Sequence, residues 1–168
     1  MARLETERLT LTPITAELVD ALLHDRGAAE RLVGAAIPEG FPDPELGGYL
    51  PVYAQRLRED PAQLGFGPWI AVSRADGSVV LSGGFLGKPG EERSIELGYG
   101  TDPAYRGRGL ATEAALALAE WGLAQPGVER VVSRCDPANE PSVRVLEKAG
   151  FVRIGEADGM LLWEWRPD

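Results

Sequence analysis

A glycine-rich segment with two arginines joins a predicted strand to the clearest predicted helix of the chain. Residues 99–112 read Tyr-Gly-Thr-Asp-Pro-Ala-Tyr-Arg-Gly-Arg-Gly-Leu-Ala-Thr. The first N–H groups of a helix lack intrahelical partners and lie at the positive end of its dipole, so a loop without bulky side chains can bind a phosphate there. Gly107 and Gly109 allow close approach of the backbone, while Arg106 and Arg108 add positive charge. The segment predicts a phosphate-bearing ligand; a tight connection with solvated arginines is the alternative.

Other phosphate-binding signatures do not match. The sequence contains no Gly-x-x-x-x-Gly-Lys-Ser/Thr segment, and Gly107-x-Gly109-x-x-Thr112 lacks the third glycine of a dinucleotide fingerprint. These mismatches argue against nucleotide hydrolysis and against hydride transfer.

The composition limits the class of protein. The chain has 168 residues, of which 44% are apolar, and this suits a single globular domain over residues 1–168. A net charge of −9 argues against nucleic-acid partners and mildly favours cationic substrates such as amines, although solubility explains the charge equally well. Because Cys135 is the only cysteine and His24 the only histidine, we expect no disulfide and no metal site. Cys135 is expected to be buried.

No segment has the pattern of a signal peptide or a membrane span. Residues 1–12 mix charges with leucines and contain no apolar stretch, and no later run of apolar residues is long enough to cross a bilayer. We therefore expect a cytoplasmic location and no membrane partner.

The elements before the glycine-rich segment follow from hydrophobic periodicity. Residues 6–14 alternate in polarity, which predicts a strand, and residues 16–33 show helical spacing interrupted by Gly27, which predicts two short helices. Residues 34–51 predict a loop around a helical piece that continues through Leu57. Turn residues then separate three antiparallel strands: residues 69–73, 79–86 and 94–99. In the third strand, alternation places Glu96 on the face opposite Ile95 and Leu97.

The elements after it alternate between helix and strand. Residues 110–124 predict a largely buried helix, residues 128–135 a strand, and Asn139 caps a second helix that ends at Gly150. A terminal hairpin, residues 151–157 and 160–166, carries two tryptophans expected in the core. The order predicts an α/β fold with a mixed, mostly antiparallel sheet of about six or seven strands and helices on both faces.

Two blocks of the sequence, in this order, resemble the GNAT acetyltransferase superfamily. Arg106-x-x-Gly109-x-Ala111 matches its pyrophosphate motif, and residues 139–151 (Asn-Glu-Pro-Ser-Val-Arg-Val-Leu-Glu-Lys-Ala-Gly-Phe) are similar to its second conserved block. Residues 5–11 (Glu-Thr-Glu-Arg-Leu-Thr-Leu) also resemble the branch of ribosomal-protein N-terminal (alanine/serine) acetyltransferases. The resemblance is weakest over residues 34–67.

The resemblance implies acetyl-CoA as co-substrate and places its parts on the chain. In the family the strand before the glycine-rich loop and the next strand diverge, and the pantetheine arm inserts between them; Asn139 and Ser142 then lie near the sulfur. The implied coenzyme-binding residues are Tyr99, Gly100, Thr101, Arg106, Gly107, Arg108, Gly109, Leu110, Ala111, Thr112, Asn139 and Ser142.

The resemblance also implies catalytic roles. Acetyl transfer to an amine requires removal of a proton, and acidic residues on this strand often act as base in related enzymes, so Glu96 is the candidate; a solvated carboxylate is the alternative. Many members use a tyrosine on the last helix to protonate the thiolate, but Leu146 stands there, which leaves Ser142 as a hydrogen-bond donor to the sulfur.

The acceptor is normally bound by the first helices and their loops, here residues 16–53. The branch favours a protein N-terminal α-amine, and a small-molecule amine is the alternative. A regulatory module that binds acetyl-CoA without turnover is the rival function. The state is expected to be monomer or homodimer. Acidic residues that could attract an amine are Asp20, Glu30, Glu39, Asp43 and Glu45.

Overall fold

The computed structural model describes residues 2–167 and contains one sheet of eight strands in the order β1-β2-β3-β4-β5-β6-β8-β7. The strands are β1 (Leu4–Glu5), β2 (Leu9–Pro13), β3 (Pro68–Ser73), β4 (Ser78–Phe85), β5 (Ser94–Thr101), β6 (Arg130–Cys135), β7 (Phe151–Ala157) and β8 (Met160–Trp165). The helices are α1 (Ala16–His24), α2 (Arg26–Val33), α3 (Pro44–Glu59), α4 (Leu110–Leu123) and α5 (Glu140–Ala149), with short 3₁₀ turns η1 (Pro61–Gln63) and η2 (Pro103–Tyr105).

The sheet is mixed, as the sequence predicts. Consecutive strands from β1 to β5 pair antiparallel, and β5 and β6 form the only parallel pair among the described strands. A parallel pair needs a crossover connection, and α4 supplies it between β5 and β6. The α/β class of the fold and the strand–helix–strand unit are therefore confirmed.

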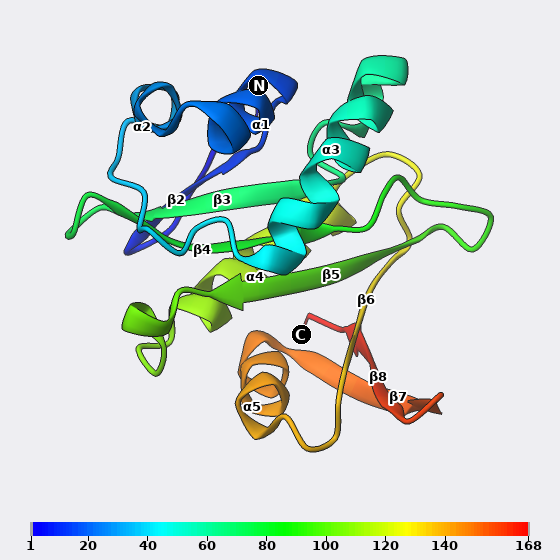
Figure 1. The fold of residues 1–168 in the computed structure, drawn as a ribbon. Helices are drawn as coiled ribbons and strands as arrows, with labels where there is room; N and C mark the ends of the chain where they lie inside the picture. Colours follow the sequence, from blue (N-terminus) through cyan, green and yellow to red (C-terminus); the bar gives the residue numbers. More distant parts are fainter. Residues whose placement is uncertain (1, 168) are drawn as a thin grey trace.

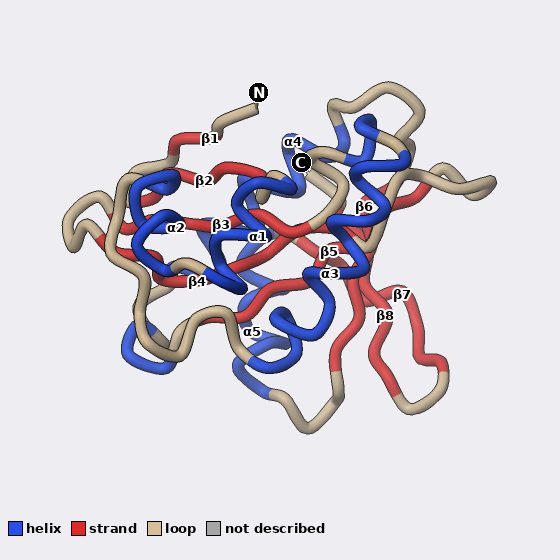
Figure 2. The backbone as a smooth tube through the Cα atoms, turned by 45° about the horizontal axis from the view of Figure 1, so that its top comes forward, coloured by secondary structure: helices blue, strands red, loops and turns tan. Residues whose placement is uncertain are grey.

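Helices cover both faces of the sheet (Figure 1). Helices α1, α2 and α3 lie together over one face, which is clear when they come forward in Figure 2, and α4 lies behind the other. Leu118 of α4 and Leu146 of α5 are fully buried in the core cluster that also contains Trp163 and Trp165. Since fully burying a leucine stabilises a protein by roughly 1.5–3 kcal/mol, these side chains fix α4 and α5 against the strands that they must position.

Three details differ from the predicted elements. The sheet has one more strand because residues 4–5 pair with residues 10–11 to form β1, too short to give a periodic signal. The break between α1 and α2 lies at Asp25, which ends α1 and caps α2, and not at Gly27. Helix α3 begins at Pro44 despite its internal Pro51, because Asp43 caps it and its buried face includes Leu50 and Tyr53.

The strands β5 and β6 pair over only part of their length. Their register joins Ser94 with Arg130 and ends where Leu97 meets Ser133. Beyond that point residues 98–101 stay paired with β4, whereas the end of β6 pairs with β8. The backbone of residues 98–101 therefore faces no strand on its β6 side, as the family resemblance implies. No helix in residues 2–167 is long and apolar enough to cross a membrane.

Candidate functional site

The connection from β5 to α4 ends in the glycine loop, residues 106–109. Gly107 and Gly109 both have φ of 78°, in the left-handed region that glycine adopts without strain. The first hydrogen bond within α4 runs from Glu113 N to Gly109 O at 3.1 Å, so the N–H groups of residues 110–112 have no partner within the helix. Gly109 offers no side chain to cap them. The helix thus begins with donors that an anion can accept.

The start of α4 differs from the starts of the other described α-helices. Each of those begins on a residue whose side chain accepts a hydrogen bond from the first turn: Thr15, Asp25, Asp43 and Asn139. A side-chain cap contributes about 1 kcal/mol to stability. The start of α4 lacks this contribution, and an anion bound to its free N–H groups would supply it. This arrangement fits the phosphates of a coenzyme A molecule.

The two arginines of the loop lie along it. Arg106 Nε donates to Thr101 O at 3.2 Å, and Arg108 Nη2 donates to Ala104 O at 3.3 Å. The Arg108 guanidinium also lies 5.0 Å from the centre of the Tyr105 ring. Neither arginine forms an ion pair with a carboxylate within residues 2–167, so both charges are available at the helix start, as the sequence predicts.

A third arginine, from the distant N-terminal segment, holds the glycine loop. Arg8 Nη1 donates to Arg108 O at 2.8 Å, and Arg8 Nε donates to Glu113 Oε1 at 2.8 Å. Thr6 also donates to Glu113. Burial alone would raise the pKa of Glu113, but the hydrogen bonds from Thr6 and Arg8 hold it below its usual value. We call these four residues the Arg8 bracket; sequence reasoning missed it because its members are about a hundred positions apart.

The divergence of β5 and β6 brings Tyr99 and Ser142 together. The Tyr99 hydroxyl lies 2.9 Å from Ser142 Oγ and 3.3 Å from Ser142 O. Burial raises the pKa of the Tyr99 hydroxyl, and the hydrogen bond with Ser142 opposes that shift. Asn139 caps α5 by accepting from Ser142 N at 3.2 Å. The sequence named Tyr99 only for its backbone and gave no signal that its phenol meets Ser142.

Glu96 lies on the face of β5 that it shares with Gly98 and Gly100, as predicted from alternation, while Ile95 and Leu97 are buried on the other. Its side chain is 24% exposed, and its Oε1 accepts from Arg134 Nε at 3.2 Å. Glu96 is therefore an ion-paired carboxylate at the edge of the site. Leu146, at 0% exposure, is a core residue and supplies no acid.

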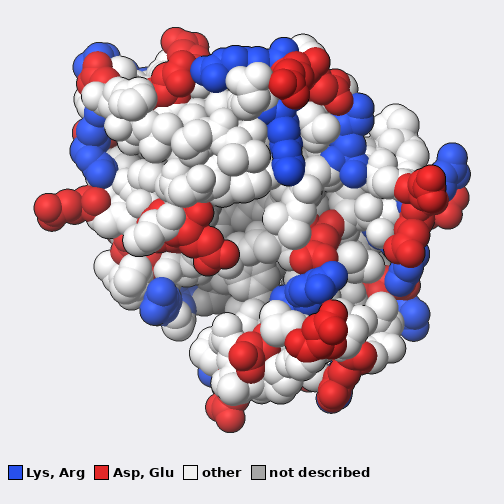
Figure 3. Space-filling model, turned by 45° about the vertical axis from the view of Figure 1, so that its right-hand side comes forward, with Lys and Arg blue, Asp and Glu red and all other residues white. Residues whose placement is uncertain are grey.

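A cavity of about 410 Å³ opens between the start of α3 and the strands β4 and β5. Figure 3 shows a hollow near the centre of the molecule with acidic side chains beside it. We call this the α3–β5 cavity; its lining includes Asp43, Glu45, Leu46, Tyr49, Ser82, Phe85, Gly98, Tyr99 and Gly100. Glu96 is not part of this lining, although it precedes Gly98 by two positions on the same strand face.

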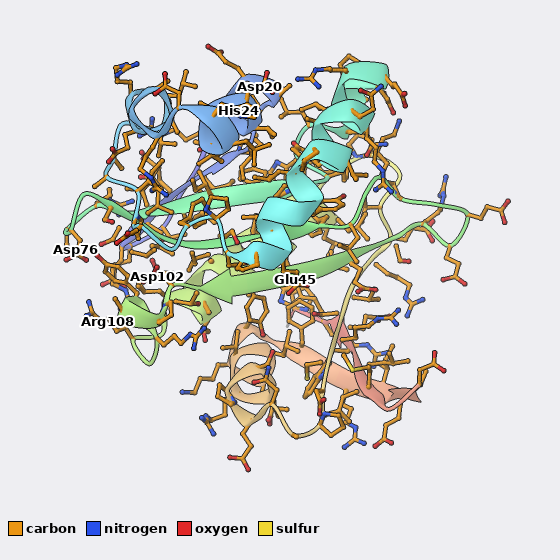
Figure 4. The ribbon with its side chains drawn as sticks, viewed as in Figure 1. Asp20, His24, Glu45, Asp76, Asp102 and Arg108 are labelled. Atoms are coloured by element: carbon orange, nitrogen blue, oxygen red, sulfur yellow. The ribbon has the colours of Figure 1, made fainter. Side chains whose placement is uncertain are left out.

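Only part of the predicted acceptor region contributes to the cavity. Asp43 and Glu45 line it, and Glu45 lies at the end of α3 nearest β5 (Figure 4). Asp20 instead pairs with Arg58 at 3.2 Å, and Glu30 accepts from Ile37 N at 3.0 Å. His24 is exposed at the end of α1, away from the cavity.

Arg26 fixes the loop that leads into α3. Its guanidinium donates to four backbone carbonyls, at distances from 2.9 to 3.2 Å, on residues 37, 38, 39 and 41. The cavity wall that carries Asp43 is thereby tied to α2.

Comparison with known proteins identifies the family of the chain. Residues 8–152 match the model described as acetyltransferase (GNAT) domain. The chain is 34% identical over 152 residues to YjdG of Bacillus subtilis (strain 168), named an uncharacterized N-acetyltransferase, and the match covers 90% of each chain.

Solved structures share the fold. The ribosomal-protein-S5-alanine acetyltransferase of Vibrio fischeri is 19% identical with a TM-score of 0.68, and the alignment covers 99% of this chain and 100% of that one. A chimera of the spermidine N-acetyltransferase SpeG from Vibrio cholerae is 12% identical with a TM-score of 0.63, covering 95% of each chain. The neighbours thus include the branch that residues 5–11 resemble.

Proposed function

The chain belongs to the GNAT acetyltransferase family and is an acyl-CoA-dependent acetyltransferase; from this premise we propose that it moves the acetyl group of acetyl-CoA to a primary amine by direct attack. The observation that carries the proposal is the uncapped start of α4 behind the glycine loop, beside the divergence of β5 and β6. The acceptor that we favour is a protein N-terminal α-amine, with a small-molecule amine as the alternative.

Acetyl-CoA supplies a thioester carbonyl for attack and a thiol as leaving group. The N–H groups of the glycine loop and of residues 110–112 bind its pyrophosphate, with Arg106 and Arg108 adding charge. The free backbone of residues 99–101 pairs with the pantetheine arm, and Asn139 and Ser142 lie toward the sulfur. These roles are supported by the unpaired edge of β5 beyond Leu97 and by the contact between α4 and α5.

The chain must also take a proton from the amine and stabilise the leaving sulfur. An ammonium has no lone pair, so Glu96 accepts the proton, directly or through a water molecule. The ion pair with Arg134 fixes the position of the Glu96 carboxylate. Backbone N–H groups near residues 99–101 stabilise the developing oxyanion, and the Ser142 hydroxyl donates to the departing sulfur.

The choice of acceptor rests on the branch resemblance and on similar proteins. One neighbour is named for a ribosomal protein and another for spermidine, so the shared fold accommodates both kinds of amine. The resemblance of residues 5–11 favours the ribosomal-protein branch and therefore a protein N-terminus.

Titration calorimetry with acetyl-CoA, followed by an amine and peptide panel with detection of free thiol, tests the proposal. We expect binding to acetyl-CoA and thiol release that depends on an amine. Binding without release from any acceptor would contradict transfer and favour a regulatory module that only binds the coenzyme. Absence of binding would contradict the coenzyme assignment itself.

A further inference from the structure

The chemistry of the α3–β5 cavity restricts the acceptor. We propose that this cavity receives the amino end of the acceptor and selects a primary amine on an uncharged body over an amine that carries a carboxylate. The inference rests on the proposed acetyl transfer and specifies which amines it uses. Three separate features of the cavity support it: a floor without side chains, a serine hydroxyl without a hydrogen-bond partner, and carboxylates without an ion pair.

The floor of the cavity is kept open by Gly98. A Cβ placed on Gly98 would meet no protein atom within 4 Å, and the residue does not have a left-handed φ. Neither the backbone nor a close neighbour therefore requires glycine here. Gly98 is exposed and lines the cavity together with Gly100, so the absence of side chains leaves space for a ligand against β5.

The wall contributed by β4 holds an unused hydroxyl group. Ser82 is only 9% exposed and lines the cavity, and its hydroxyl forms no hydrogen bond within residues 2–167. Its oxygen is not among the fully buried side-chain atoms of these residues that lack a partner, so it opens to the cavity. An amine in the cavity can donate to this oxygen when protonated, or accept from the hydroxyl when neutral.

The charge at the cavity is negative and is not ion-paired. Asp43 and Glu45 form no ion pair within the described part of the chain, and no lysine, arginine or histidine lines the cavity. The Asp43 carboxylate lies 3.8 Å from the position of a Cβ on Gly100, so it reaches the floor. An ammonium is attracted here, whereas a second carboxylate on the acceptor would be repelled, since Arg134 at the edge of the site is already paired with Glu96.

The first test compares alaninamide with alanine, which differ by the carboxylate next to the amine. Because the amine of alanine is more basic than that of alaninamide, kcat/KM is calculated on the concentration of the neutral amine. On that basis we expect the value for alaninamide to exceed that for alanine at least about tenfold, since one unpaired like-charge contact costs about that factor or more. A tripeptide amide beginning with alanine, and butylamine, distinguish a peptide source of the amine from a small-molecule source.

The second test removes the charge and keeps the helix start. Asp43→Asn with Glu45→Gln should reduce the preference for alaninamide to within about threefold, because asparagine caps α3 as well as aspartate does. Affinity for acetyl-CoA should stay unchanged in calorimetry. Glu59→Gln, at the other end of α3, is the matched control and should preserve the preference.

The third test fills the floor. Gly98→Val should raise KM for alaninamide about tenfold or more, with Kd for acetyl-CoA within about threefold, because a side chain there meets only the acceptor space. Gly155→Val in β7 is the control: its Cβ would also meet nothing within 4 Å, but it lies outside the cavity. It should leave KM unchanged.

The outcomes separate the inference from the function on which it rests. Equal use of alanine and alaninamide, or an unchanged preference in the Asp43/Glu45 double variant, overturns the selection rule while acetyl transfer stands. Thiol release with unchanged KM in Gly98→Val places the acceptor elsewhere. If no amine in the set releases thiol, the proposed function fails first and the inference fails with it.

Discussion

The starts of α4 and α3 are the same kind of element, and they offer opposite charge to a ligand. Helix α4 begins on Gly109 without a side-chain cap and exposes its first N–H groups beside two arginines. Helix α3 begins on Asp43, whose Oδ1 accepts from Leu46 N at 2.8 Å, and it carries Glu45 in the first turn. The start of α4 therefore has no carboxylate cap, whereas the start of α3 is capped by the Asp43 carboxylate.

The difference bears on how an acidic protein would bind both a phosphate ligand and an amine, as proposed above. The net charge of −9 describes the whole chain, but the cap residue decides the local sign at each helix start. A glycine cap leaves the positive end of the dipole free, whereas the negative charge of an aspartate cap outweighs it. The two proposed binding functions would therefore be separated by the choice of one residue at each helix start.

The largest expected effect comes from giving α4 the kind of start that α3 has. Gly109→Glu should abolish measurable coenzyme binding, a loss of at least about 100-fold, because it adds a carboxylate and a Cβ at a left-handed position. Titration calorimetry with coenzyme A measures it. Gly34→Glu is the control, since Gly34 has φ of 74° at the end of α2 with no atom near its Cβ. Retained affinity in Gly109→Glu would show that the phosphates bind elsewhere.

The next largest expected effect is a loss of turnover on removal of the proposed base, Glu96. Glu96→Gln should lower kcat about 100-fold with Kd for acetyl-CoA unchanged, because glutamine cannot accept the proton. Glu129→Gln breaks an exposed ion pair with Arg93 and should leave kcat unaltered. A kcat within twofold of wild type for Glu96→Gln would mean that water or another group takes the proton.

A change in the Arg8 bracket should weaken the α4 site without abolishing it. Arg8→Gln removes the bond to Arg108 O and the ion pair with Glu113, so Kd for coenzyme A should rise about 3- to 10-fold. Amine KM should not change, because the α3–β5 cavity lies on other residues. Arg3→Gln breaks the exposed pair with Glu5 and serves as control. Equal effects on both ligands would indicate general destabilisation instead.

The smallest expected effect is on stability against pH. The pKa of Glu113 lies below its ordinary 4.5 in the folded protein, so its stabilising contribution is present above pH 4.5 and is lost as the pH falls through the lowered value. The free energy of unfolding, measured in urea, should therefore differ more between wild type and Glu113→Gln at pH 6 than at pH 3. A difference that does not vary with pH would mean that the carboxylate charge is unimportant.

The sequence predicted the parts of the molecule that depend on neighbouring residues. The α4 periodicity, the glycine loop and the Asn139 cap are local patterns, and the structure places all three as expected. Position along β5 also followed from alternation, which put Glu96 opposite Ile95. The roles of these residues in catalysis and coenzyme binding stay predictions.

Features that depend on distant segments gave no usable signal. Arg8 and Glu113 are 105 positions apart, and nothing in either neighbourhood marks the pair. The α3–β5 cavity was also missed, because Ser82 and Gly98 read only as ordinary strand residues until α3 lies over them. The start of α3 was hidden by its glycines and Pro51, whose low helix propensity is outweighed by the burial of Tyr53.

The Arg8 bracket connects β2 to the glycine loop before α4. Ligand binding at this loop should therefore change how often the backbone amides of β2 open to solvent. Leu9 begins β2, and Arg8 beside it reaches the loop that precedes α4. A ligand that holds this loop must also oppose the local opening that frees Arg8, since such coupling is reciprocal. Native-state hydrogen exchange of the amides of residues 9–12 should then slow when coenzyme A is added, even though none of these residues need touch it.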